Sequence, residues 1–136
     1  GKDVWVHRNG TVRANGPARM IHPLFSQTGE PVFIPSSMST PAYICAGTDE
    51  NDSTFFSASH GTGRRKDPQT DAVHDKDALM KKMESSNVKL FNAKSKGVVM
   101  QDRGYYKDVE EVINGMEENK IVKVVAKMEP VAVLMY

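Results

Sequence analysis

A helix and a strand that follow each other near the C-terminal end place the strongest constraint on the fold. Asp108, with Glu111 three residues later, predicts a capping box that opens the helix. The apolar residues of this helix fall at i, i+3, i+4 and i+7, namely Val109, Val112, Ile113 and Met116. We interpret these four as core residues rather than as a cofactor-binding box. At 121–128 the pattern changes to the alternation of a strand.

Shorter strands are predicted in the first half of the chain. Residues 3–8 alternate like a strand and run into Asn9-Gly10, which predicts a hairpin with residues 11–13. Residues 15–30 hold prolines and glycines without periodicity and are predicted to form a loop. Further strands are predicted at 31–35, 42–47 and 53–59.

The predicted fold class is α+β, a strand-rich layered domain with two short helices in the C-terminal half. The first of these helices is predicted at 75–84, where apolar residues recur with partial helical spacing. Trp5 and Phe33 are predicted to lie in the core. Residues 1–136 are expected to form a single domain, with the polar loops that follow the strands on one rim.

Composition limits the classes of partner. A net charge of +1 and a pI near 8.0 exclude strong capture of nucleic acid by overall charge. RNA contact therefore requires a local cluster, and Arg64, Arg65 and Lys66 form the only dense one, although such a run is usually a solvated surface. The single cysteine, Cys45, excludes an intramolecular disulfide framework and is interpreted as a core residue. No apolar run approaches the ~18 residues of a membrane span, so we expect a cytoplasmic protein without membrane contact.

The segment His60-Gly61-Thr62-Gly63-Arg64 carries the groups best suited to phosphate chemistry. Glycines let backbone N–H groups approach a ligand closely, and an arginine fork can bind phosphate oxygens. An imidazole can act as a base, a metal ligand or a covalent nucleophile. The alternative is a tight glycine turn with a capping histidine, and for this motif alone we rank that alternative first.

Other polar segments are open to two interpretations. His7-Arg8 lies at the end of a predicted strand and carries groups suited to a metal ion or a phosphate. The hydroxyl-rich residues 36–41 could bind an anion, but capping of their own turns is the commoner explanation. Tyr105 and Tyr106 could stack on RNA bases, although adjacent tyrosines before a helix more often pack against it.

Five segments resemble, in order, signature segments of the RtcB-type RNA-splicing ligases. They are residues 6–14, 31–40, 60–64, 106–109 and 128–134. The resemblance covers nearly the whole chain and implies the α+β fold of the C-terminal part of such a ligase. That family joins RNA 3′-phosphate or 2′,3′-cyclic phosphate ends to 5′-hydroxyl ends. In its reaction a histidine attacks GTP to form a histidine-guanylate, and GMP then passes to an RNA 3′-phosphate. A 5′-hydroxyl displaces the GMP, and manganese ions assist the transfers.

The resemblance implies a role for each matched residue. His60 resembles the guanylated nucleophile, and His7 resembles a manganese ligand. The resemblance places the guanylate against Arg8, Pro35, Ser36, Ser37, Met38, Gly61, Thr62 and Gly63, with Arg64 on the phosphate side. The other manganese ligands, an aspartate, a cysteine and two histidines, are expected in an N-terminal part or partner chain, and Cys45 does not match the cysteine. The implied partner is broken RNA, such as tRNA halves.

Several positions depart from the family pattern. The family's near-terminal lysine, which contacts guanine, is replaced within Met135-Tyr136, and serines stand at Ser36 and Ser39 where the family has glycines. Three hypotheses follow. The chain is a fragment or split half of an RNA ligase that is inactive alone, a non-catalytic module that binds nucleotide or RNA phosphate, or a stable fragment whose loops only form turns. A missing half also predicts an exposed apolar face where that half would pack.

Overall fold

The computed structural model describes residues 3–65, 75–95 and 97–134 of the 136-residue chain. Within these residues the architecture is α+β, as predicted, with helices α1 (Lys76–Ser85) and α2 (Val109–Glu118) in the C-terminal half. The strands are β1 (Thr11–Arg13), β2 (Pro31–Ile34), β3 (Ala42–Gly47), β4 (Ser57–Ser59), β5 (Lys89–Phe91), β6 (Val122–Met128) and β7 (Ala132–Leu134). Short 3-10 helices lie in the connections, at Pro17–Arg19, Pro23–Phe25, Asp52–Thr54, Val98–Gln101 and Arg103–Tyr105.

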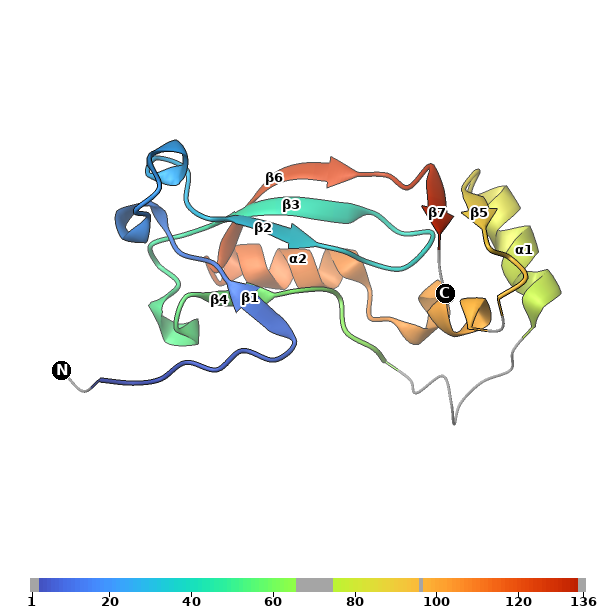
Figure 1. The fold of residues 1–136 in the computed structure, drawn as a ribbon, viewed down its shortest axis with the longest axis horizontal. Helices are drawn as coiled ribbons and strands as arrows, with labels where there is room; N and C mark the ends of the chain where they lie inside the picture. Colours follow the sequence, from blue (N-terminus) through green and yellow to red (C-terminus); the bar gives the residue numbers. More distant parts are fainter. Residues whose placement is uncertain (1–2, 66–74, 96, 135–136) are drawn as a thin grey trace.

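The central sheet has the strand order β2-β3-β6, and both pairings are antiparallel. Helix α2 lies along one face of this sheet (Figure 1). The ladder between β3 and β6 shifts its register between Ile44 and Cys45, which is a β-bulge or similar irregularity. Strand β1 pairs with β4 in an antiparallel pair, and β5 pairs with β7 in a parallel pair.

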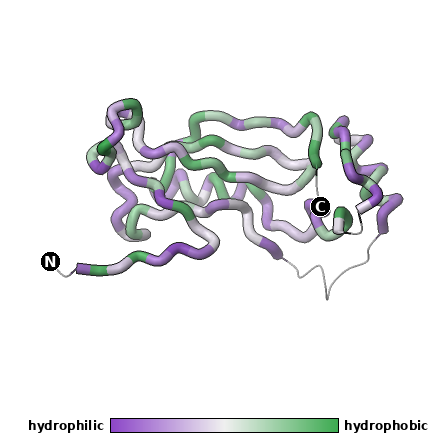
Figure 2. The backbone as a smooth tube through the Cα atoms, in the orientation of Figure 1, coloured by the Kyte–Doolittle hydropathy of each residue, from purple (hydrophilic) through white to green (hydrophobic). Residues whose placement is uncertain are grey.

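The main core lies between the central sheet and α2. From α2 it contains Val109, Ile113 and Met116, and Val112 packs against it half-buried, which confirms the helical pattern read from the sequence. From the sheet it contains the alternate residues Val32, Ile34, Tyr43 and Cys45, together with Val122. Figure 2 shows apolar stretches along the strands of this sheet and along α2. Alternation in the strands and 3.6-residue spacing in the helix therefore produce one shared apolar layer.

A second, smaller cluster joins α1 to the serine-rich loop after β2. Leu79 and Met83 of α1 pack with Val88, Val98 and Met38, and all five side chains are buried. Met38 is only 1% exposed, although it belongs to the loop that follows β2. The second cluster therefore anchors part of that loop, which comprises residues 35–41.

Side-chain caps define both helices. The Asp108 carboxylate accepts hydrogen bonds from the backbone N–H groups of Glu110 at 2.8 Å and Glu111 at 3.4 Å, which confirms Asp108 as the cap of α2. The predicted helix at 75–84 is also confirmed, because Asp75 caps α1 through the N–H of Ala78 at 2.9 Å. In the part of the chain that the structure describes, neither helix has the length and hydropathy needed to cross a membrane.

Two predictions about the first half of the chain are wrong. Residues 3–8 form no strand, because among the described residues no other segment pairs with them, and β1 pairs with β4 instead of closing a hairpin at Asn9-Gly10. Trp5 and Phe33 are not core residues, since they are 92% and 57% exposed.

The strand predicted at 53–59 is shorter than expected. Only Ser57–Ser59 pairs as β4, and a 3-10 helix occupies Asp52–Thr54. Between them Phe55 and Phe56 both have φ near +53°, a left-handed conformation that cannot continue a strand. The backbone conformation of these two residues therefore starts the strand at Ser57.

An ion pair ties β1 to the residue before β2. Arg13 donates to both carboxylate oxygens of Glu30 at 2.6–3.0 Å, and Glu30 also accepts from the N–H of Asn15 at 3.1 Å. The hydrogen bond from Arg13 holds the pKa of Glu30 below its usual value, against the opposite effect of partial burial. The pair therefore stabilises the fold only while Glu30 is ionised.

We predict that Glu30→Gln lowers the free energy of unfolding by about 0.5–1 kcal/mol at neutral pH, as expected for a bidentate pair at a largely exposed arginine. Because the folded-state pKa is depressed, this contribution is present above the unfolded-state pKa of about 4.3 and disappears as the pH falls through the lower folded-state value. Denaturant unfolding of both proteins from pH 7 downward checks this. A stability difference that does not shrink as the pH is lowered through the titration of Glu30 would contradict it.

Candidate functional site

The loop after β2 is organised around one hydroxyl group. The Oγ1 atom of Thr40 lies 2.7 Å from the hydroxyls of Ser36 and Ser37, and it accepts from the N–H of Ser37 at 3.0 Å. The side chain of Ser37 is buried, and Met38 points into the second cluster. These hydroxyls therefore bond to one another within the loop, as expected for groups that cap their own turn, and their contact with a ligand stays a prediction. Met38 can line a ligand only with its backbone.

The loop after β4 presents His60 to solvent. The N–H of His60 donates to the carbonyl of Gly10 at 3.5 Å, and the hydroxyl of Ser59 donates to the carbonyl of Gly61 at 2.5 Å. Gly63 has φ +71°, a conformation that favours glycine. These contacts hold the backbone of the loop while they leave the His60 side chain exposed.

Thr62 is the unusual residue of this loop. It is only 4% exposed, yet its hydroxyl has no hydrogen-bond partner among the described residues. A buried hydroxyl without a partner costs about 1–3 kcal/mol unless another group satisfies it. Thr62 is therefore a candidate donor to a ligand that enters beside His60.

The structure brings three of the predicted segments together. A methyl group on Gly61 would lie 3.5 Å from the carbonyl oxygen of Pro35, so the loops after β2 and β4 are in close contact. On the other side, the N–H of Lys107 donates to the carbonyl of Gly63 at 3.1 Å. The His60 loop therefore lies between the serine-rich loop and the segment that leads into α2.

Arg64 is largely engaged within the protein. Its guanidinium donates to the carbonyl of Met100 at 3.0 Å, to the hydroxyl of Tyr106 at 3.1 Å and to Gln101 at 3.3 Å. It also lies 4.8 Å from the centre of the Tyr106 ring. Arg64 thus ties the loop to the 3-10 helices before α2, and its role on the phosphate side stays a prediction. Lys66, the third cation of the predicted cluster, lies outside the described residues.

His7 and Arg8 lie beside β4. Arg8 donates to the hydroxyl of Ser57 at 2.9 Å and to the carbonyl of Phe55 at 2.9 Å. Both residues line a cavity of about 470 Å³ that also includes Ser57 and Ser59. The predicted manganese ligand is therefore close to β4, the strand that precedes His60, but it does not line the same cavity as Ser37.

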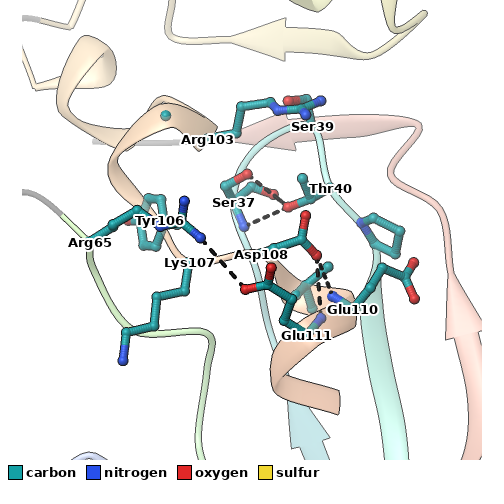
Figure 3. Close-up of a pocket in the computed structure, with 13 residues that line it drawn as sticks. Ser37, Ser39, Thr40, Arg65, Arg103, Tyr106, Lys107, Asp108, Glu110 and Glu111 are labelled. Atoms are coloured by element: carbon teal, nitrogen blue, oxygen red, sulfur yellow. Dashed lines mark hydrogen bonds and ion pairs between the residues drawn. The ribbon is translucent and has the colours of Figure 1, made fainter. Parts of the chain in front are cut away.

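A polar pocket of about 490 Å³ opens at the beginning of α2 (Figure 3). Its walls include Ser37 and Thr40, the cations Arg65, Arg103 and Lys107, and the carboxylates Asp108, Glu110 and Glu111. His60 does not line it. The sequence does not predict Arg103 as a site residue. It includes Lys107 only as part of the matched segment 106–109.

The carboxylates of this pocket already have partners. Asp108 caps α2, Glu111 lies 3.6 Å from Arg65, and Glu110 lies 2.7 Å from Lys127. The hydrogen bond from Lys127 lowers the pKa of Glu110, so this carboxylate stays ionised and its charge is balanced by that of Lys127. Arg103 and Lys107 have no ion pair among the described residues. The pocket is therefore suited to an anionic group of a ligand.

The described residues do not assemble a metal centre by themselves. No group of three histidine, cysteine, aspartate or glutamate side chains in this part of the chain is arranged to hold a metal ion. Burial raises the pKa of the Cys45 thiol to about 11, which confirms it as a core residue and opposes the thiolate form that binds metals. The role of His7 as a manganese ligand stays a prediction.

Comparison with known proteins identifies relatives along the whole chain. The model of the family described as tRNA-splicing ligase RtcB matches residues 1–136. The chain is 36% identical over 135 residues to the tRNA-splicing ligase RtcB of Pyrococcus horikoshii, which covers 96% of this chain and 15% of that protein. It is 34% identical over 137 residues to the enzyme of the same name from Methanococcus maripaludis, which covers 98% of this chain and 28% of that protein.

A third relative is covered over a similarly small share of its length. The RNA-splicing ligase RtcB of Mycobacterium tuberculosis is 30% identical over 131 residues, which covers 95% of this chain and 30% of that protein. The chain therefore spans less than a third of the length of these curated relatives.

We predict that Thr40→Val destabilises the protein by about 1–2 kcal/mol, because it removes the common partner of Ser36 and Ser37. Thr11→Val is the matched control, since Thr11 is exposed on β1 and its hydroxyl has no hydrogen-bond partner among the described residues. Denaturant unfolding measures both. Equal stability of the two variants would show that the hydroxyl of Thr40 does not organise the loop.

Proposed function

Because the chain belongs to the RtcB family of tRNA-splicing ligases, we propose that it is the part of an RNA ligase that carries the nucleotide-accepting histidine. The ligase would join an RNA 3′-phosphate or 2′,3′-cyclic phosphate end to a 5′-hydroxyl end, and tRNA halves are the expected substrate. The observation that carries the proposal is the exposed His60 side chain on a loop held between two other matched segments.

The chemistry proposed for His60 is nucleotide transfer. A neutral imidazole nitrogen attacks the α-phosphorus of GTP, the bond from this phosphorus to the bridging oxygen breaks, and pyrophosphate leaves. The GMP then passes to the RNA 3′-phosphate, which frees the imidazole, and the 5′-hydroxyl finally displaces GMP as the new phosphodiester forms. Exposure of His60 fits this role, because both GTP and an RNA end must reach the same nitrogen in turn.

The surroundings of His60 fit a nucleotide. The unpartnered Thr62 hydroxyl supplies a donor inside the loop, and the glycines on either side of it leave the backbone accessible. Arg103 and Lys107 supply positive charge in the neighbouring pocket. We assign to this pocket a negatively charged part of the nucleotide or of the RNA.

The described residues do not fit a complete manganese site. His7 is the only metal ligand that we assign to this chain, and no group of three such side chains surrounds it in the described structure. We therefore derive no step through manganese here. On this proposal the remaining ligands come from an N-terminal part or partner chain, and the isolated chain does not ligate RNA.

The alternative is a non-catalytic module that binds nucleotide or RNA phosphate. The observation that favours it is the set of replaced positions, because the family's guanine-contacting lysine is replaced within Met135-Tyr136 and serines stand at Ser36 and Ser39 where the family has glycines. This alternative retains the polar pocket before α2 but requires no covalent chemistry at His60.

We predict covalent labelling of the chain by α-labelled GTP and manganese when the part of the Methanococcus maripaludis relative that the matched region leaves out is present. His60→Ala should abolish the label, and His22→Ala, another exposed histidine, should leave it unchanged. A denaturing gel measures the label. Because His60 is exposed, its replacement should not change the thermal unfolding midpoint.

Two outcomes would contradict this proposal. Label that survives in His60→Ala would place the nucleotide on another residue. Saturable binding of GTP without label, in a folded complex with both chains present, would favour the non-catalytic module instead.

A further inference from the structure

The face of the central sheet that is opposite α2 is apolar. Val32, Ile34, Tyr43 and Cys45 point into the main core, so the alternate residues Phe33 and Ile44 point the other way. Phe33 is paired with Ile44 across β2 and β3, and Ile44 is paired with Ala126 across β3 and β6. These three side chains form an apolar row across the whole sheet, which we call the outer face.

Neighbouring residues extend this apolar surface. Ala42 and Met128 form the next cross-strand pair along β3 and β6. Phe33 and Ile44 are 57% and 36% exposed. In Figure 1, α2 covers only the inner face of the sheet, and Figure 2 shows apolar residues along all three strands.

A solvent-facing sheet surface normally has a different composition. An antiparallel sheet that is covered on one face alternates apolar residues inward with polar residues outward. Phe33, Ile44 and Ala126 break this rule together and in register. A contiguous exposed apolar row of this kind is a candidate contact surface for another polypeptide.

We propose that the outer face is the docking surface for the remaining part of an RtcB polypeptide. The length of the relatives points to this partner, because this chain spans only 28–30% of the length of the Methanococcus maripaludis and Mycobacterium tuberculosis proteins. The proposal rests on the proposed function only in so far as both require that remaining part.

The size of the outer face favours this partner over a second copy of the chain. Three strands about 4.8 Å apart, over a length of about five residues at about 3.3 Å each, give a face of roughly 250 Å². A stable interface buries about 800 Å² on each partner, so a face this small needs additional contacts elsewhere. A polypeptide more than twice as long as this chain can supply them, for example along the exposed segment that contains Val4, Trp5 and Val6.

The test measures association without nucleotide, manganese or RNA. The chain is mixed with the part of the Methanococcus maripaludis relative that the matched region leaves out, and sedimentation gives the stoichiometry and Kd. We expect a 1:1 complex, and we expect Phe33→Ser with Ile44→Ser to weaken it about 100-fold. The matched control is Ile21→Ser with Leu24→Ser, which removes two exposed apolar side chains outside the central sheet and should leave the Kd unchanged.

Each other outcome overturns the proposal. Failure of two folded chains to associate, or equal weakening by both double variants, would show that the outer face is not the docking surface. Self-association of the chain alone that Phe33→Ser abolishes would identify a second copy as the occupant. His60→Ala should bind as tightly as the wild type, so a failure of nucleotide transfer and a failure of docking remain distinguishable.

Discussion

The packing of α2 against the inner face of the central sheet holds the candidate site in place. Val109, the first residue of α2, is buried in the main core, and Asp108 caps the helix immediately before it. The preceding residue, Lys107, donates its N–H to Gly63 in the His60 loop. A displacement of the helix would therefore move the backbone contact that positions this loop. The contact made by Lys107 lies only two residues before the first residue of α2.

Most of the regular structure could be predicted from the sequence because its periodic patterns are long. The helix that begins at Val109 and the strand at Val122–Met128 follow their apolar spacing closely. Trp5 and Phe33 show the limit of such patterns. Alternation indicates which residues share a face of a strand, but it does not indicate whether a second layer covers that face. Phe33 shares a face with Ile44, and that face is the exposed one.

The candidate site was predictable as a set of segments but not as a set of contacts. Resemblance selected the loops that contain Pro35 and Gly61, and the structure places them against each other. The sequence contains no sign that the Arg64 fork is occupied by Met100, Gln101 and Tyr106, because those contacts depend on the path of the chain. The roles of His7, His60 and the guanylate-lining residues stay predictions. The replaced guanine contact at Met135-Tyr136 lies outside the described residues.

Met38 gives the serine-rich loop a dependence that its hydroxyl network does not reveal. The loop begins at the end of β2, in the main core, yet its most buried side chain belongs to the cluster around α1. If the α1 cluster opens as a separate cooperative unit, the loop loses its anchor while the sheet and α2 stay folded. The backbone N–H of Ser37, held by Thr40, would then exchange with solvent at the rate of that local opening rather than of global unfolding. The shape of the candidate site is thus coupled to the less extensive of the two cores.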